Sequence, residues 1–162
     1  MKHSDLAVDL IIKSESNGSG RPYLSATVDE LGRASVGYGH TINGRLFIVP
    51  MSAHDCIDLL KEDLAKWEEW VNNKIHHRSI EQHQFDALLC WAFHVGQGRA
   101  EAHGQEFEHS LLMQFAFDGK MQLAAAEFDN WVLVRERPSK KLLARRQAEK
   151  YLFLYGSVPF AI

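Results

Sequence analysis

The sequence predicts an α+β fold that is mostly α, with a small antiparallel sheet, a long connecting helix and a helical body. Residues 15–51 have the Gly, Pro, Asn and Ser density of turns between short alternating strands. From position 52 onward, apolar residues recur at helical spacing. We therefore expect one domain of 162 residues, with a β-rich lobe at 15–51, a connecting helix at 52–75 and a helical lobe from 1–14 and 76–162.

Composition narrows the possible classes of protein. Hydrophobic residues make up 46% of the chain, enough for a core and unlike a disordered protein. The net charge of −3 provides no overall basic field for nucleic acid. The basic segment 135–150 is either a solvated helix face or a surface for an anionic polymer. Cys56 and Cys90 fall at apolar helical positions, so we expect buried, reduced thiols. The nine histidines lack metal-ligand spacing, so we expect no metal and no cofactor.

The N-terminal residues do not have the pattern of a signal peptide. Asp5 and Asp9 interrupt the apolar run, and no small-residue cleavage pattern follows. No segment approaches the roughly 18 consecutive apolar residues of a membrane span. We expect synthesis in the cytoplasm and no membrane insertion, so another system would carry the protein to any other compartment.

The first helix is expected to begin at Ser4 or Asp5, either of which can cap it. Glu15 lies four residues after Ile11, so it continues the apolar face at the helix end. Partial desolvation raises the pKa of a carboxyl group, which suits a general acid. The alternative is a solvated glutamate at a frayed helix end.

Short strands and turns are expected after this helix. Gly32 can adopt the positive φ of a turn, and Asn43-Gly44 is a hairpin signal. The predicted strands of one antiparallel sheet are Tyr23–Asp29, Ala34–Tyr38 and Leu46–Val49.

The remaining chain reads as helices. Ser52 and Asp55 form a capping box before a helix that runs to about Lys74, and Ser79 with Gln82 suggests a second box. The other predicted segments are a central helix ending near Gly96, a loop at 96–104, helices at 107–115, 121–131 and 140–155, and a loop at 135–139.

Five motifs follow one another along the chain: the helix ending in Glu15, Asp-x-x-Gly-x-x-Ser with Gly-Tyr-Gly-His-Thr (29–41), Gln-Phe-Asp-Ala-Leu with Ala-Phe-His-Val-Gly (84–96), Ser-Leu-Leu (110–112) and Arg-Arg-x-Ala-Glu (145–149). Together they resemble the phage-type (T4-like) lysozymes, glycoside hydrolase family 24. The resemblance covers nearly the whole chain and implies a lysozyme-like fold of two lobes. It also implies hydrolysis of the β-1,4 bond between N-acetylmuramic acid and N-acetylglucosamine in peptidoglycan.

The resemblance implies a catalytic role for three residues. Glu15 would protonate the leaving oxygen, and Asp29 would activate water on the opposite face of the sugar, as in an inverting glycosidase. Ser35 would help to hold that water. Asp29 follows Glu15 by fourteen residues, more than is common in the family, so Thr27 and Glu30 remain alternatives for the second role.

The family pattern also implies a binding and supporting set. Gly37 and Gly39 would let the backbone approach a sugar, and Phe93 and His94 would contact substrate. The supporting residues are Tyr23, His40 as a brace to an acidic residue of the connecting helix, and Arg145 or Arg146 beside Glu15. Because a cation opposes protonation of Glu15, we expect it to be loosely placed or mainly an orienting group.

Two other activities fit the same scaffold. A lytic transglycosylase cleaves the same bond without water, and a catalytically silent module would only bind peptidoglycan or associate with a spike. In the hydrolase reading, the protein acts on the cell wall in the periplasm as a monomer. It would be a phage endolysin released through a holin, or an antibacterial effector injected by a secretion system and inhibited by an immunity protein.

Overall fold

The computed structural model describes residues 1–16, 18–28, 32–42, 50–75, 79–97, 100, 102 and 105–158. Its helices are α1 (Asp5–Glu15), α2 (Ala53–Lys74), α3 (Gln82–Val95), α4 (Leu111–Phe117), α5 (Met121–Glu127) and α6 (Lys140–Tyr155), with 3-10 turns η1 (Phe107–His109) and η2 (Phe128–Asn130). Strands β1 (Tyr23–Val28), β2 (Ala34–Gly37) and β3 (His40–Thr41) form one antiparallel sheet, and β4 (Leu133–Val134) pairs with β5 (Arg137–Pro138).

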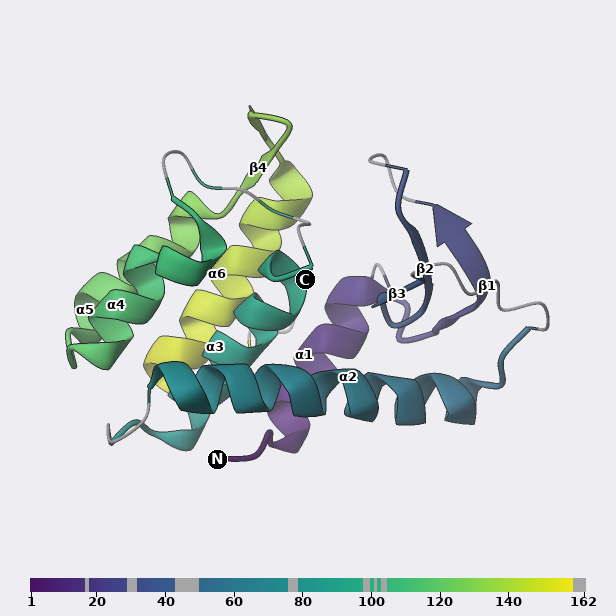
Figure 1. The fold of residues 1–162 in the computed structure, drawn as a ribbon, viewed down its shortest axis with the longest axis horizontal. Helices are drawn as coiled ribbons and strands as arrows, with labels where there is room; N and C mark the ends of the chain where they lie inside the picture. Colours follow the sequence, from purple (N-terminus) through teal and green to yellow (C-terminus); the bar gives the residue numbers. More distant parts are fainter. Residues whose placement is uncertain are drawn as a thin grey trace.

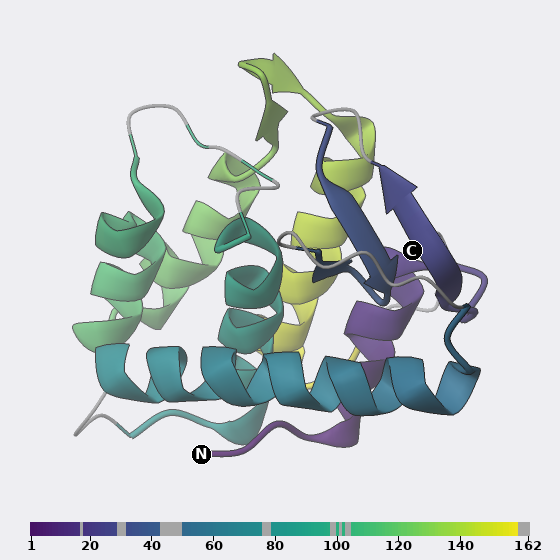
Figure 2. The ribbon, with the colours of Figure 1, turned by 45° about the vertical axis from the view of Figure 1, so that its right-hand side comes forward.

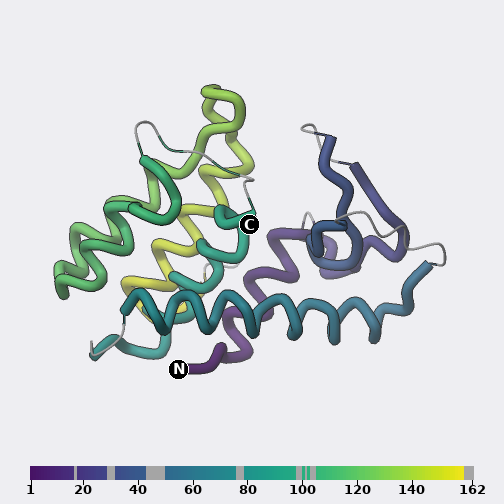
Figure 3. Tube along the Cα trace, in the orientation of Figure 1, coloured from purple at the N-terminus to yellow at the C-terminus, as the bar shows by residue number. Residues whose placement is uncertain are grey.

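The helix α2 carries the sheet near its N-terminal end and the helical body, α3 to α6, at its other end (Figures 1 and 3). The sheet contacts α2 through β2 and β3, while α3 packs on α2 and α6. α1 contacts α3 and α6 and leads into the sheet (Figure 2). The predicted mostly helical α+β class is confirmed. Among the described residues, every helix is too short or too polar to cross a lipid bilayer.

α1 forms as its sequence predicts. The Ser4 hydroxyl accepts from the Leu6 amide as the N-terminal cap. Ala7, Leu10 and Ile11 are buried and form the face that packs on the body. The helix ends at Glu15, so this residue lies at the end of the buried face, next to the chain that enters the sheet.

The first two strands lie where the sequence predicts them. β1 pairs with β2, and β2 pairs with β3 through Ser35 and Thr41. The third strand of the described sheet is therefore β3, which the sequence pattern did not indicate. The strand predicted at 46–49 lies outside the described residues.

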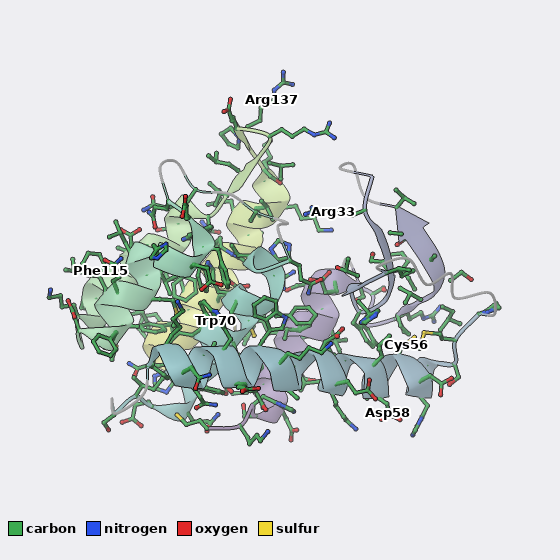
Figure 4. All side chains as sticks on the ribbon, viewed as in Figure 1. Arg33, Cys56, Asp58, Trp70, Phe115 and Arg137 are labelled. Carbon is green, nitrogen blue, oxygen red and sulfur yellow. The ribbon has the colours of Figure 1, made fainter. Side chains whose placement is uncertain are left out.

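α2 begins with the predicted capping box, in which the Ser52 hydroxyl and Asp55 carboxylate bond to each other's backbone amides. Cys56 faces the sheet, whereas Asp58 points away from it (Figure 4). A Cβ on Gly37, whose φ is 66°, would lie 3.4 Å from the Cβ of Cys56. The positive φ, which L side chains rarely adopt, is therefore the main reason for glycine here, and a Cβ would come into contact with α2.

α3 is the central helix of the body, and every residue from Phe85 to Val95 is buried. It begins at Gln82, and the Gln84 side chain accepts from the Glu81 amide, so the predicted cap at Ser79 is wrong. α6 ends at Gly156, whose φ of 66° confirms the predicted glycine terminator.

The loop predicted at 135–139 is instead part of the β4–β5 hairpin. Its turn residues, Arg135 and Glu136, have φ angles of 49° and 63°. These angles are typical of a two-residue hairpin turn, but glycine and asparagine usually supply them. The hairpin places Arg137 at an outer edge of the molecule (Figure 4).

The two cysteines are free and buried, as predicted. Burial raises the pKa of the Cys90 thiol well above its ordinary value and also raises that of Cys56. Both thiols are therefore neutral near pH 7.

Candidate active site

Glu15 lies in a pocket of about 260 Å³ between the end of α1, the end of α3 and the start of α6. Its side chain is 11% exposed, so the predicted partial desolvation is present. The pocket is lined by Lys13, Ser14, Glu15, Gly18, His94, Lys141, Leu142, Ala144 and Arg145.

Arg145 is the basic partner of Glu15. Its Nη1 donates to Glu15 Oε1 at 2.6 Å, while Arg145 itself is 6% exposed. The geometry leaves no room for a loosely placed cation, so an orienting role is the remaining expectation. Arg146 is fully buried and donates from Nη2 to Glu149 at 2.7 Å.

Glu149 joins the two arginines. Its Oε1 accepts from Arg145 Nε at 3.1 Å as well as from Arg146. Burial would lower the pKa of Arg145, but attraction by Glu15 and Glu149 outweighs burial and raises it. Arg145 therefore keeps its charge between two carboxylates.

The two residues expected at the substrate side of α3 have different positions. His94 lines the Glu15 pocket and is 7% exposed. Phe93 is 0% exposed, lies within the core and is not among the residues that line the pocket, so its contact with substrate stays a prediction. Because α3 is buried on all sides, helical spacing alone does not identify its pocket-facing residue.

The sheet positions the remaining predicted residues. Ser35 lies in β2, and its carbonyl accepts from the Thr27 hydroxyl at 3.4 Å. Tyr23 pairs with Gly37 at the start of β1. The candidates Asp29 and Glu30 lie outside the described residues.

Gly37 and Gly39 are both buried and have positive φ angles, 66° and 91°. At Gly37, a Cβ would face Cys56 of α2 at 3.4 Å and not an open surface. The positive φ is a different reason for glycine from the predicted approach of a sugar.

His40 makes the bridge to the connecting helix that the resemblance implies. Its Nδ1 lies 2.7 Å from Oδ2 of Asp63, which is 12% exposed at its side chain. Lys66 lies 3.5 Å from the other carboxylate oxygen. The pair fixes β3 on the middle of α2.

Gln97, which follows α3, joins the sheet to the helical body. Its Oε1 accepts from the Thr41 hydroxyl at 2.8 Å, and its carbonyl accepts from Arg33 at 3.1 Å. Its Nε2 donates to the Phe93 carbonyl at 2.7 Å, which fixes the side chain on α3.

A second pocket of about 330 Å³ lies between β3, α2 and Gln97. It shares no lining residue with the Glu15 pocket. Trp70, which rises from α2 (Figure 4), lines this pocket. Its ring stacks on that of Phe107 with ring centres 4.5 Å apart. The other lining residues are His40, Thr41, Asp63, Lys66, Trp67 and Gln97.

Sequence reasoning left three contributors without a role: Glu149, Gln97 and Lys141. A usable signal existed only for Glu149, which lies four residues after Arg145 and three after Arg146, where helical side chains meet. Gln97 and Lys141 depend on tertiary contacts that no local pattern encodes.

Comparison with known proteins agrees with this architecture. The model of the phage lysozyme family matches residues 20–149. The matched range begins after Glu15 and therefore does not include it. The muramidase domain of SpmX from Asticaccaulis excentricus superposes with a TM-score of 0.76 at 32% identity, covering 94% of this chain and 97% of that one.

Two endolysins show the same relationship in sequence. The endolysin of Salmonella phage P22 is 31% identical over 135 residues, which cover 81% of this chain and 86% of the relative. The endolysin of Bacillus phage PZA is 32% identical over 126 residues, 76% of this chain. That alignment spans only 45% of the Bacillus phage protein. With its family match over most of its length, the chain belongs to the phage lysozyme family.

Proposed function

We propose that this protein hydrolyses peptidoglycan at the β-1,4 bond between N-acetylmuramic acid and N-acetylglucosamine. The observation that carries the proposal is Glu15, a nearly buried carboxyl group held by Arg145 in an open pocket. A carboxyl in such surroundings can donate a proton to a leaving glycosidic oxygen.

In this mechanism, Glu15 is the general acid and Arg145 fixes its orientation. Asp29 would activate the attacking water, and Ser35 would help to hold it on the sheet side. His94 would contact the sugar beside Glu15, since it lines the same pocket. Inversion at the anomeric carbon is expected, because a separate carboxylate handles water.

The relatives suggest the biological setting. Two of them are phage endolysins, so we propose lysis of the bacterial cell wall as the purpose of the reaction. Action in the periplasm, delivery through a holin or a secretion system, control by an immunity protein and a monomeric state belong to the same proposal.

The decisive variant is Glu15→Gln, which keeps the shape of the side chain and removes its acidic proton. Digestion of purified peptidoglycan should fall by at least about a hundredfold, the lower range for loss of a general acid. Asp5→Asn is the control, because Asp5 lies in the same helix at its exposed first turn. Wild-type digestion by Glu15→Gln would refute the proposal.

The products separate the alternative activities. Mass spectrometry should find reducing sugar ends, and proton NMR of fresh product should find the inverted anomer. Ends of the 1,6-anhydro type would indicate a lytic transglycosylase. Binding without any cleavage by the wild-type protein would indicate a silent module.

A further inference from the structure

Glu149 shares the cation that holds the proposed acid. Arg145 donates from Nη1 to Glu15 and from Nε to Glu149, so one guanidinium serves two carboxylates. We propose that Glu149 is a positioning residue. It shares the positive charge of Arg145 with Glu15 and so weakens the attraction that would keep Glu15 ionised and unable to donate a proton. This inference rests on the proposed function.

The position of Glu149 is fixed from two sides. It lies one helical turn after Arg145 and Arg146 and accepts from both at one oxygen, at 3.1 and 2.7 Å. Its side chain is 0% exposed. Its carboxylate is shielded from bulk solvent, so its attraction to the two arginines is screened less than it would be at the surface.

The charged cluster of Glu15, Arg145, Arg146 and Glu149 carries a free-energy cost of burial that packing of the fold does not require. Burial raises the pKa of Glu149 and lowers that of Arg146 to about 10. Within the described part of the chain, Nε and Nη1 of Arg146 and Oε2 of Glu149 have no hydrogen-bond partner. Buried ion pairs often stabilise a fold no better than apolar residues of similar size. Retaining this cluster therefore suits an electrostatic role at the neighbouring site.

The role follows from the signs of the charges. An arginine beside a carboxyl group favours its ionised form, whereas a general acid must carry its proton. Without Glu149, the positive charges of Arg145 and Arg146 would favour the ionised form of Glu15 more strongly than they do with it. With Glu149, two negative and two positive charges balance across the cluster.

Other charged or titratable groups on the packed elements stay the same in the variants below, so they cancel in the comparison. The Cys90 thiol is neutral near pH 7, because burial raises its pKa well above the ordinary value. These groups include Lys13 from α1, Asp86, Cys90 and His94 from α3, Glu127 from α5, Asp129 from η2 and Lys141 from α6.

Three variants test the proposal: Glu149→Gln, Arg146→Met and the double variant. Carbon-13 NMR of the Glu15 side-chain carboxyl gives its titration midpoint without requiring activity. The midpoint should fall by roughly one pH unit in Glu149→Gln, because a neighbouring negative charge is lost. It should rise in Arg146→Met and return near the wild-type value in the double variant.

Enzyme kinetics supply the second readout. In Glu149→Gln, the alkaline limb of the kcat profile should move to lower pH, with kcat at neutral pH down about tenfold for a shift of one unit. KM should be unchanged, since Glu149 lies below the pocket surface. If the midpoint of Glu15 is unmoved while activity falls in step with Tm, the proposal is overturned and Glu149 only supports the fold.

The variants also cover a failure to fold. If Glu149→Gln does not fold, the difference between the double variant and Arg146→Met gives the effect of the Glu149 charge. A lower midpoint in the double variant supports the proposal, and equal midpoints overturn it. Full activity of Glu15→Gln would instead refute the proposed function, whatever the midpoint does.

Discussion

At the scale of single residues, the acid site joins positions that are remote in sequence. Glu15 and Arg145 are 130 positions apart, and the resemblance left Arg145 and Arg146 as alternatives. Adjacent helical residues point about 100° apart, so only one of the two can face Glu15. The sequence could therefore predict an arginine at this site, but the packing of α6 on α3 selects Arg145 and turns Arg146 into the core.

Gly96 shows how one contact fixes a residue type. Its φ of −62° suits any amino acid, so alanine would normally stabilise this helix end. A Cβ here would overlap the indole ring of Trp67 and lie 2.7 Å from the Ala92 carbonyl oxygen. We expect Gly96→Ala to destabilise the protein by about 1–3 kcal/mol in urea unfolding, as overpacking does.

The overlap with Trp67 can be isolated with a double-mutant cycle. Trp67→Leu removes the ring, and adding Gly96→Ala to this variant should then cost less than in the wild-type protein, because only the contact with the Ala92 carbonyl remains. A coupling energy near zero would show that the indole is not the obstacle.

At the scale of helices and strands, local rules succeed where the signal is local. Ser52 with Asp55 and the glycine at 156 were predictable, because capping depends on residues within one turn. The cap of α3 was not, because Ser79 and Glu81 both offer acceptors at plausible positions. Phe93 and His94 could not be separated either, since α3 is buried on every side and its periodicity carries no information about faces.

The β4–β5 hairpin escaped prediction for a related reason. Its turn contains Arg135 and Glu136 in place of the glycine or asparagine that normally marks a turn with two positive φ angles. Each side chain in this conformation costs on the order of 1 kcal/mol. The backbone conformation of the turn therefore disfavours the hairpin, and other contacts must outweigh this cost.

Relieving this strain should stabilise the protein. We expect the double substitution Arg135→Asn with Glu136→Gly to raise the unfolding free energy by about 1 kcal/mol. Tm should rise by roughly 2–4 °C in differential scanning calorimetry. Arg137→Asn, in the paired strand β5, is the control and should produce no gain. Loss of stability in the double variant would mean that the two side chains hold the hairpin through their own contacts.

At the scale of the whole molecule, α2 runs along both the sheet and the helical body. Its 22 residues span roughly 33 Å. His40 ties the sheet to α2 through Asp63, and the N-terminal segment ties down α2 through Glu68. Glu68 accepts from Lys2 Nζ at 2.8 Å and from the His3 amide at 2.7 Å.

The Glu68 contacts make stability depend on pH. Burial would raise the pKa of Glu68, but hydrogen bonds from Lys2 and His3 outweigh it and lower the pKa. The stabilisation is therefore complete above the ordinary range of glutamate, near pH 4.3, and is lost as pH falls through the lowered value.

We expect Glu68→Gln to be less stable than wild type by on the order of 1 kcal/mol at pH 7. The difference should disappear as pH falls below about 4, in urea unfolding measured across pH. Glu69→Gln is the matched control, because Glu69 is the exposed neighbour on the same helix. An equal loss of stability at pH 7 and pH 3 would contradict a contribution from the charge of Glu68.

The end of α1 has one further consequence. An α-helix carries a partial negative charge at its C-terminus, and Glu15 is the last residue of α1. The helix dipole therefore disfavours the ionised carboxylate at the position where the proposed reaction needs a proton donor. Extending the same helix by one turn would move the negative end of the dipole away from Glu15. The position at which α1 ends therefore helps Glu15 to keep its proton.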